Sequence, residues 1–447
     1  MKRLFSKARF FVWWGRAFFS RYTKQLTVGF TVGFLLIIFG LKFYPLVSSL
    51  VPNKKVVGVV GNYTPTTLPM SIQNLISLGF TKVNTKGEAL PSLAVSWETK
   101  EEGKVYIFRL KEDILWHDEK KFTAHDINYQ LRDVEIKPLD DFTIEVRLKE
   151  PFSPLPVLLS QPLFKKGLVG TGNYKVLNLK LNLDRIELIS LVSADSEKDL
   201  PQLIFRFYPT EAAAVTAFKL GEVDTLQELS DIYNLASWKE IEIEEKTLQN
   251  RVETIFFNTS SGLLQEKAFR QALSYAIPDS EAKRARGPIC ADSWAFSEEV
   301  KVYNFDFEKA QELLKKDDLA SDSASLILST FAPYLSLAQK VARSWEKLGI
   351  KTVIQVENTI PEEFDALLTT QEIPPDPDQY PLWHSTQEAT NISNLKDVRI
   401  DKFLEDGRKT FEKEQRKIIY EDFQKYLLDE SPAAFIRNPT VYTISRK

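Results

Sequence analysis

A long uncharged run near the N-terminus precedes the alternating patterns of the rest of the chain. Leu26–Leu41 contains no charged side chain, and a second, mostly apolar stretch, Phe43–Val51, follows Lys42. A helix over the first run would rise about 24 Å, slightly less than the ~30 Å hydrocarbon core of a bilayer. Because Lys42 can extend its ammonium group toward the interface, the pattern predicts a membrane-spanning helix over Leu26–Val47.

After a short connector, Pro52–Lys55, the pattern changes to short apolar runs and to alternation with period two. Alternation is typical of half-buried strands, and a valine-rich run that ends at glycine is typical of a buried strand. Strands are predicted over Val56–Val60, Val105–Leu110, Thr143–Leu148, Ile204–Tyr208, Thr254–Phe257, Leu326–Thr330 and Lys351–Val356.

Helical periodicity is clearest in the second half of the chain, where apolar residues recur three and four positions apart with charges between them. Helices are predicted over Glu211–Leu220, Phe269–Ala276, Phe307–Lys316, Leu335–Leu348 and Phe403–Leu428. The helix Leu335–Leu348 ends at Gly349 and lies between two predicted strands, which is the order of a βαβ unit. The fold class predicted from pattern is therefore mixed α/β with two layers of helices.

The charges that flank the apolar run predict the direction in which it crosses the membrane. Residues 1–25 contain no acidic residue, and the first acid of the chain is Glu88; the basic residues of this tail are Lys2, Arg3, Lys7, Arg9, Arg16, Arg21 and Lys24. The positive-inside rule predicts a cytoplasmic tail over 1–25, with the domain outside, extracellular or periplasmic, on a single-pass anchor in the cell membrane. A cleaved signal peptide is the competing interpretation. It would need a charged region of about 25 residues, and no A-x-A-like site follows the apolar run.

The body beyond the anchor is acidic. Eight of the 58 basic residues precede Asn53, so 50 basic residues stand against 61 acidic ones from there on, an excess of 11 negative charges. This balance argues against nucleic acid as a partner, because phosphate binding depends on clustered Lys and Arg. The single cysteine, Cys290, cannot form an internal disulfide, and it is far from the apolar run, which excludes a lipoprotein anchor.

Motifs for catalysis or metal binding are missing from the sequence. There is no G-x-S-x-G, H-E-x-x-H, phosphate loop or G-x-G-x-x-G. His117, Asp118 and His125 are candidate metal ligands, but the step between the two histidines matches no compact zinc pattern. The sequence predicts a binding protein, not an enzyme, with no metal and no cofactor.

Four stretches carry a family resemblance. They are Gly87–Ile127 (with P-S-L-A-V-S-W and L-W-H-D), Val169–Tyr174 (V-G-T-G-N-Y), Gly221–Asp224 (G-E-V-D) and Phe256–Ile277 (F-F-N-T and F-R-Q-A-L-S-Y-A-I). In this order they resemble the family 5 extracellular solute-binding proteins of ABC importers, the dipeptide-, oligopeptide- and nickel-binding group. Only a short stretch separates Ile127 from the next family strand, so the third domain of larger members looks reduced.

The resemblance implies a two-lobed fold of the class II periplasmic-binding-protein type with a reduced extra domain. The first lobe would comprise 53–256 and 431–447, and the second 257–430. The chain would cross between them near Phe256–Thr259 and Ser431–Ala434. A ligand would bind between the lobes, and closure would occur about these crossings.

The ligand-contact candidates are nine residues, namely Gly170, Thr171, Gly172, Asn258, Glu372, Asp376, Asp378, Trp383 and His384. The glycines of Gly170–Gly172 suit either a tight turn or a direct ligand contact. The last four lie in a proline-rich segment that is predicted to be a loop. A Trp wall with a carboxylate would suit a ligand that is apolar along its length and cationic at one end. The alternative is a loop packed on its own Trp.

The predicted function is capture of a peptide, or of a similar small solute, for ABC permease subunits. An alternative from another class is a membrane-tethered sensor or adhesion module with the same fold and no transport role, which the short connector favours. A hydrolase acting on cell-wall peptides is the third possibility.

Overall fold

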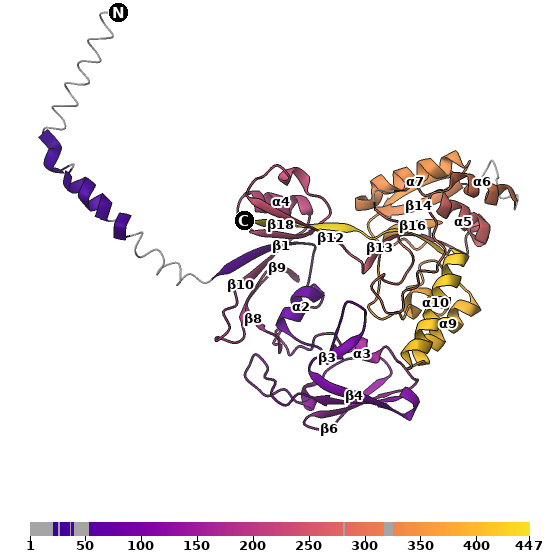
Figure 1. Cartoon of the computed structure of the whole chain (residues 1–447), viewed down its shortest axis with the longest axis horizontal. Coiled ribbons are helices and arrows are strands. Elements are labelled where there is room, and N and C mark those ends of the chain that lie inside the picture. The colour runs from indigo at the N-terminus through magenta and orange to yellow at the C-terminus, as the bar shows by residue number, and fades with distance from the viewer. Residues whose placement is uncertain (1–20, 26, 36, 40–52, 280–281, 317–324) are drawn as a thin grey trace, which may run out of the picture. The chain divides into compact units, whose positions relative to one another are not determined.

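The computed structural model describes residues 21–25, 27–35, 37–39, 53–279, 282–316 and 325–447 (Figure 1). The chain divides into two compact units. One is Met1–Lys55 with Leu200–Gln202, and the other comprises Val56–Asp199 and Leu203–Lys447. The second unit holds nearly all of the described strands.

The described residues of the first unit include the helix Arg21–Phe39, of 19 residues, which is long and apolar enough to cross a membrane. Its apolar side chains are mostly exposed, with Phe30 77% accessible. The helix begins before Leu26, the predicted start. The remainder of the predicted span, up to Val47, and most of the predicted tail lie outside the described residues.

A seven-stranded sheet begins the second unit. Its order is β12-β18-β11-β1-β10-β9-β8, and its strands are β1 (Lys54–Val60), β8 (Tyr174–Asn182), β9 (Arg185–Ser193), β10 (Gln202–Tyr208), β11 (Thr225–Leu229), β12 (Ile241–Thr247) and β18 (Thr440–Arg446). Helix α4 (Glu211–Lys219) packs Phe218 and three small apolar residues against Leu226, Leu229 and Ile444 of this sheet. Thr210 caps the helix by accepting a hydrogen bond from the Ala213 amide.

A smaller four-stranded sheet has its own core. Its order is β4-β5-β7-β6, with β4 (Ala94–Lys100), β5 (Val105–Leu110), β6 (Val134–Asp140) and β7 (Thr143–Leu148). The strands β5 and β7 have the predicted bounds. Aromatic rings, among them Phe80, Phe108 and Trp116, fill the core beneath it. Beside it lie helix α2 (Met70–Ile76), the strands β2 (Thr81–Val83) and β3 (Ala89–Pro91), and helix α3 (Leu155–Leu158).

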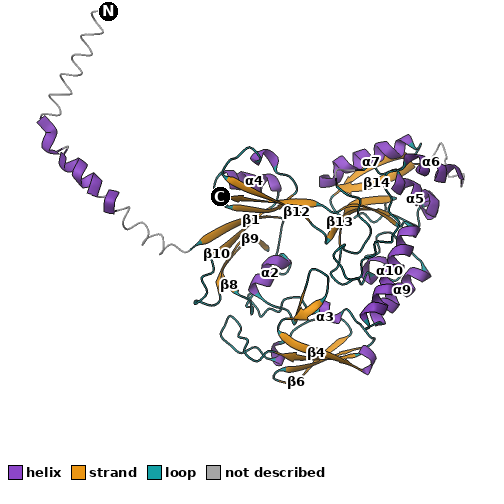
Figure 2. Ribbon diagram, in the orientation of Figure 1, coloured by secondary structure: helices purple, strands orange, loops and turns teal. Residues whose placement is uncertain are grey.

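The five-stranded sheet has the order β15-β14-β16-β13-β17, with β13 (Arg251–Phe257), β14 (Ser325–Phe331), β15 (Lys351–Glu357), β16 (Ala366–Glu372) and β17 (Ala433–Arg437). Strands β14 and β15 are parallel and α7 connects them, so the predicted βαβ unit is confirmed. Helices cover both faces (Figure 2). Ile255 and Phe257 join the core of α5 (Lys267–Tyr275), α6 (Phe307–Lys316) and α7 (Leu335–Lys347). Val252 and Phe256 join the core of α9 (Val398–Lys409) and α10 (Lys413–Glu430).

The single helix predicted over Phe403–Leu428 is two helices, α9 and α10. Thr410 is extended, and the Glu412 carboxylate caps α10 by accepting from the amides of Glu414 and Gln415. The apolar periodicity continues across this break, so the pattern could not reveal it. The two helices approach closely at Gly407, where a Cβ would overlap the Tyr420 ring.

Two short segments join the seven-stranded sheet to the five-stranded sheet. One is 248–250, between β12 and β13, and the other is 438–439, between β17 and β18. They are hydrogen-bonded side by side, with the Leu248 amide donating to the Pro439 carbonyl at 2.9 Å. The crossings predicted at Phe256–Thr259 and Ser431–Ala434 are therefore misplaced, because β13 and β17 pair with each other in the five-stranded sheet.

We define the first lobe as 56–247 with 440–447, and the second lobe as 251–437. The first contains the seven- and four-stranded sheets, and the second contains the five-stranded sheet with its helices. The 3₁₀ turns of the second unit are Glu101–Gly103, Ala124–Asp126, Tyr233–Leu235, Gly262–Gln265 and Ala332–Tyr334.

Candidate functional site

Two pockets lie where the second-lobe loop 372–381 faces the first lobe. The cleft pocket has a volume of about 650 Å³. It is lined by Val83–Thr85 and Gly87 of the first lobe, by 246–250 at the end of β12 and in the crossing, and by Cys290, Asp292, Ser293 and 372–375 of the second lobe. The apolar pocket, of about 820 Å³, lies between helices α2 and α3 and the same loop. Its apolar lining residues are Met70, Leu78, Gly79, Val83, Phe152, Pro154, Val157, Leu158, Pro374, Pro375 and Pro381.

Contacts between the lobes separate these pockets. Gly87 has a positive φ of 82°, and a Cβ there would overlap the Pro375 carbonyl, so only glycine allows this approach. The Trp294 amide donates to the Lys86 carbonyl at 3.1 Å, and the Ser153 amide donates to the Arg408 carbonyl at 2.8 Å. The lobes therefore touch around the loop 372–381, and the free volume is divided on either side of it.

Asp376 and Asp378, two predicted site residues, line the apolar pocket but are already paired. The Arg416 guanidinium donates to both oxygens of Asp376, at 2.9 and 2.5 Å. Arg408 Nε lies 2.9 Å from one oxygen of Asp378. Both carboxylates are buried, at 6% and 8% exposure. A cationic ligand group would have to compete with these guanidinium groups, so the pairs position the loop and leave no free anion there.

Burial and the partner charge shift the pKa values of the residues in these two ion pairs. Burial acts to lower the pKa of Arg416, but the charge of Asp376 outweighs it and raises that pKa above the ordinary value. Burial also raises the pKa of Asp378, against the opposing effect of Arg408. Arg408 stacks on the Tyr380 ring at 3.8 Å. The loop is thus fixed to α9 and α10 by two buried ion pairs and one cation–π contact.

Glu372, the remaining acidic candidate, belongs to a charged cluster at the crossing. Its carboxylate lies 3.4 Å from Arg251, and Arg251 lies 3.6 Å from Glu228 on β11 of the first lobe. Burial, followed by the charge of Glu228, raises the pKa of the nearby Tyr63. Arg251, Glu228 and Tyr63 were not predicted as site residues. No motif marks them, because they come from three distant segments and meet only in the folded chain.

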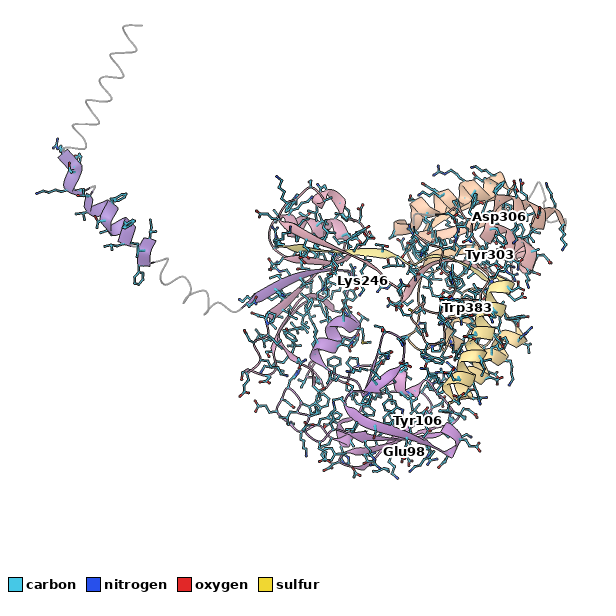
Figure 3. The ribbon with its side chains drawn as sticks, viewed as in Figure 1. Glu98, Tyr106, Lys246, Tyr303, Asp306 and Trp383 are labelled. Carbon is cyan, nitrogen blue, oxygen red and sulfur yellow. The ribbon has the colours of Figure 1, made fainter. Side chains whose placement is uncertain are left out.

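Trp383 and His384 are both buried in the second lobe, where Figure 3 labels Trp383. Trp383 is 1% exposed and contacts the rings of Phe256 and Phe435, at 5.8 and 6.2 Å between centroids. His384 stacks on Tyr380 at 3.9 Å. These contacts are those of a segment packed on its own Trp. The segment predicted as a loop also contains one helical turn, α8 (Tyr380–Trp383), because Pro381 occupies a first-turn position where no N–H is needed.

Gly170, Thr171 and Gly172 form a turn against the end of α2. A Cβ on Gly170 would overlap the Ile76 carbonyl, and one on Gly172 would overlap the Leu75 carbonyl. The Thr171 hydroxyl accepts a hydrogen bond from the Leu78 amide at 3.3 Å. The contacts are those of a tight turn, and the role of these residues in ligand contact stays a prediction.

Asn258, the last candidate, lies at the end of β13. Its side-chain amide donates to the Phe364 carbonyl at 3.0 Å, and its backbone amide donates to the Asp365 carbonyl at 2.8 Å. These bonds tie β13 to the start of β16. The contact of Asn258 with a ligand likewise stays a prediction.

His117 clamps the glycine turn. Its Nδ1 accepts from the Gly170 amide at 3.3 Å, and its Nε2 donates to the Gly172 carbonyl at 2.9 Å. Only the neutral imidazole with its proton on Nε2 satisfies both bonds. His125 instead faces Asp141 at 3.7 Å. Within the described residues, no group of three or more His, Cys, Asp or Glu side chains could hold a metal ion.

Acidification is expected to weaken this clamp. Burial lowers the pKa of His117 below 6.5, and the Gly172 carbonyl opposes the shift. The unfolded chain therefore binds the proton first as pH falls below about 6.5, so stability is full above that value and is lost below it. His117→Asn should remove this part of the pH dependence. We expect the fall in Tm between pH 7 and pH 5, followed by circular dichroism, to be about 2 °C smaller in the variant. An equal fall in both proteins would contradict the clamp.

Two α/β lobes joined by two adjacent crossings, with pockets between them, are the architecture of a two-lobed binding protein. The family model of the bacterial extracellular solute-binding proteins, family 5 (middle region), matches residues 88–391. The chain belongs to this family. Its members are solute-binding proteins, so the chain is a binding protein and not an enzyme, and the predicted family is confirmed.

Individual relatives are distant but cover most of the chain. The dipeptide-binding protein of Escherichia coli is 22% identical over 456 residues, covering 80% of this chain and 83% of its own. The structure of NikZ from Campylobacter jejuni with Ni(L-His) has a TM-score of 0.74 at 23% identity, covering 89% of this chain and 95% of its own. That of AppA from Bacillus subtilis with a nonapeptide has a TM-score of 0.71 at 20% identity, with the same coverage. These structures confirm the predicted two-lobed fold.

Proposed function

We propose that this protein captures a peptide, or a small solute of similar extended shape, between its lobes and delivers it to the permease of an ABC importer. The observation that carries the proposal is the pair of adjoining pockets along the loop 372–381, each lined from both lobes. The apolar pocket is large enough for one or more side chains, since small-molecule sites occupy roughly 300–1,000 Å³. The relatives named above include proteins that bind dipeptides and a nonapeptide.

The exposure of the carboxylates near the pockets indicates where a cationic end group of the ligand would bind. The carboxylates of Asp376 and Asp378 are buried in their ion pairs. Glu372 also has a partner, Arg251 at 3.4 Å, but its side chain is 76% exposed and it lines the cleft pocket. A cationic end group would therefore be received at Glu372, beside the crossing, and the apolar body would extend along the apolar pocket. The proposal keeps the charge of the ligand at one end, as the sequence predicts, with Glu372 as its partner in place of Asp376 and Asp378.

Blocking the apolar pocket tests the proposal. Leu158 lies on α3 and lines this pocket, so Leu158→Trp should fill it and raise the Kd for peptides at least about tenfold. Leu220→Trp is the matched control, because Leu220 is 71% exposed on the first lobe. Calorimetric titration of the full chain in an uncharged detergent with defined peptide mixtures measures both. Hydrolysis of the peptides, or unchanged affinity in Leu158→Trp with unchanged Tm, would refute capture in this pocket.

We further propose that helix Arg21–Phe39 anchors the protein in the cell membrane with its N-terminus in the cytoplasm. Its length, its exposed apolar surface and the basic residues before it support this. N-terminal sequencing of the mature protein from carbonate-washed membranes distinguishes the two interpretations. Retention of residues 1–25 supports the anchor, and a start beyond residue 39 means that the helix is a cleaved signal. Co-purification with permease subunits separates import from a tethered sensor.

A further inference from the structure

A third pocket, which we call the hinge pocket, lies against the two crossings on the face opposite the cleft pocket. It has a volume of about 600 Å³ and shares Thr247, Gln249 and Ile373 with the cleft pocket. Neighbouring residues alternate between the two. Glu245 faces the hinge pocket and Lys246 the cleft pocket, and Ala291 and Asp292 divide in the same way. The chain segments 245–250 and 289–292 therefore form a wall with one pocket on each side.

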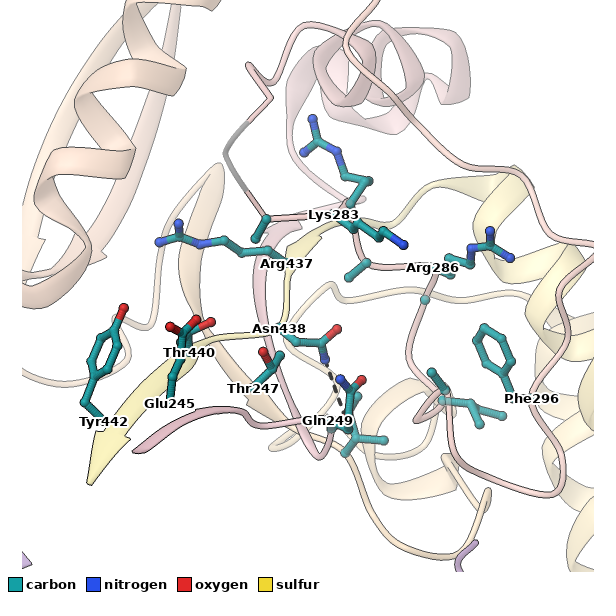
Figure 4. A pocket seen from close by; sticks show the side chains of 17 residues that line it. Glu245, Thr247, Gln249, Lys283, Arg286, Phe296, Arg437, Asn438, Thr440 and Tyr442 are labelled. Atoms are coloured by element: carbon teal, nitrogen blue, oxygen red, sulfur yellow. Dashed lines mark hydrogen bonds between the residues drawn. The ribbon is translucent and has the colours of Figure 1, made fainter. Parts of the chain in front are cut away.

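Basic side chains dominate the hinge pocket. Its charged lining residues are one acid, Glu245, and four bases, Lys283, Arg284, Arg286 and Arg437. Such a cluster is notable in a body that carries 11 excess negative charges beyond residue 52. Figure 4 shows Lys283 and Arg286 on one side of the pocket and Thr440 and Tyr442 on the other. The first two come from the second lobe, and the last two come from β18 of the first lobe.

Two of the four basic side chains form hydrogen bonds or ion pairs with other residues of the protein. Arg284 donates to the Ile277 carbonyl at 2.8 Å and to Asp279 at 3.2 Å. Arg437 forms a forked pair with the buried Glu253, at 2.8 and 3.2 Å. Lys283 and Arg286 are exposed, and neither forms an ion pair within the described part of the chain. Both residues line the pocket, and neither side chain forms a hydrogen bond with another described residue.

We propose that the hinge pocket binds a small oxyanion of the phosphate or dicarboxylate type through Lys283 and Arg286. Arg supplies a planar fork that matches two oxygens of such a group, and Lys supplies a point charge beside it. The hydroxyl groups of Thr247, Thr440 and Tyr442 and the amide groups of Gln249 and Asn438 provide neutral partners for the remaining oxygens. A volume of about 600 Å³ admits a solute larger than a bare ion.

The position of the pocket gives such an anion a structural role. Its lining comes from both lobes and from both crossings, 248–250 and 438–439. An anion bound there would bridge the two lobes on the side of segments 245–250 and 289–292 that lines the hinge pocket. It would also stabilise the folded chain, and this effect would increase with the anion concentration. Lys283 and Arg286 line neither of the proposed peptide pockets, so failure of the anion site would leave the import proposal standing.

Calorimetric titration of the full chain in uncharged detergent with inorganic phosphate, and separately with malonate, tests the proposal. We expect saturable binding of at least one of the two anions and a rise in Tm with its concentration. In Lys283→Gln/Arg286→Gln the Kd should increase about tenfold or more, because both charged donors are lost. Raising the ionic strength should weaken binding to the wild-type protein.

The matched control removes the same two charges elsewhere. Lys340 and Arg343 are exposed on α7, three residues apart like Lys283 and Arg286, and neither lines the hinge pocket. Lys340→Gln/Arg343→Gln should bind the anion as the wild-type protein does. Equal weakening in both double variants would show a general charge effect and overturn the site. Absence of saturable binding of both anions would overturn it as well.

Discussion

Replacing Arg416 by methionine is expected to lower the free energy of unfolding by about 3–5 kcal/mol, because the change leaves the buried Asp376 carboxylate without its partner. Asp376 is 6% exposed and receives two hydrogen bonds from Arg416. The same guanidinium donates from Nε to the Gly407 carbonyl at 2.9 Å, at the point where α9 and α10 approach. One substitution therefore removes the tie of the loop 372–381 to α10 and a tie between the two helices.

Two further variants show whether the loss comes from the unpaired charge. Lys402→Met breaks an exposed ion pair with Asp406 and should cost far less, because solvent screens this pair. Arg416→Met/Asp376→Leu removes both charges and should recover part of the loss. Thermal unfolding of the full chain in uncharged detergent, followed by circular dichroism, compares them. If Arg416→Met were as mild as Lys402→Met, the pair could not be what fixes the loop.

The same loop shows what the pattern of residues can predict and what it cannot. Val105–Leu110 and Thr143–Leu148 have their predicted bounds, because alternation reports directly which side chains face the core. The ion pair of Asp376 and Arg416 joins residues 40 positions apart, and neither has a local signal. A sequence shows that Asp376 is acidic; only the fold shows that its charge is already neutralised.

Glycines illustrate a related limit. The sequence predicts a turn at Gly170–Gly172, but the residue type fits both a ligand contact and a close packing contact. The structure adds that the backbone of α2 occupies the space of each Cβ, and that His117 clamps the turn. Gly87 shows the converse case, in which the family motif contains the glycine but does not reveal why glycine is needed. It stood within a family motif, and its need for a positive φ comes from the Pro375 carbonyl of the other lobe. Periodicity and motif order thus predicted several of the elements and the family, whereas the contacts between the lobes could not be predicted from them.

Trp383→Ala is expected to destabilise the protein by about 3–5 kcal/mol, since it empties a large volume in a closely packed core. The ring is 1% exposed, and it packs between Phe256 of β13 and Phe435 of β17, the two strands that follow and precede the crossings. Its Nε1 donates to the Gln379 side chain at 3.3 Å, so the cavity would also leave a buried acceptor unpaired.

The result also decides between the two interpretations of the proline-rich segment. A Trp that walls the ligand site would lose peptide affinity on substitution while its Tm stayed nearly unchanged. A Trp that supports the segment from beneath would lower Tm strongly, and Trp383→Phe would restore most of it. Trp238→Ala is the control, because Trp238 is 37% exposed on the first lobe and should cost far less. Calorimetric titration and thermal unfolding of the same three variants measure both properties. A fall in peptide affinity at unchanged Tm would make Trp383 a ligand contact and contradict its role as the core beneath the loop.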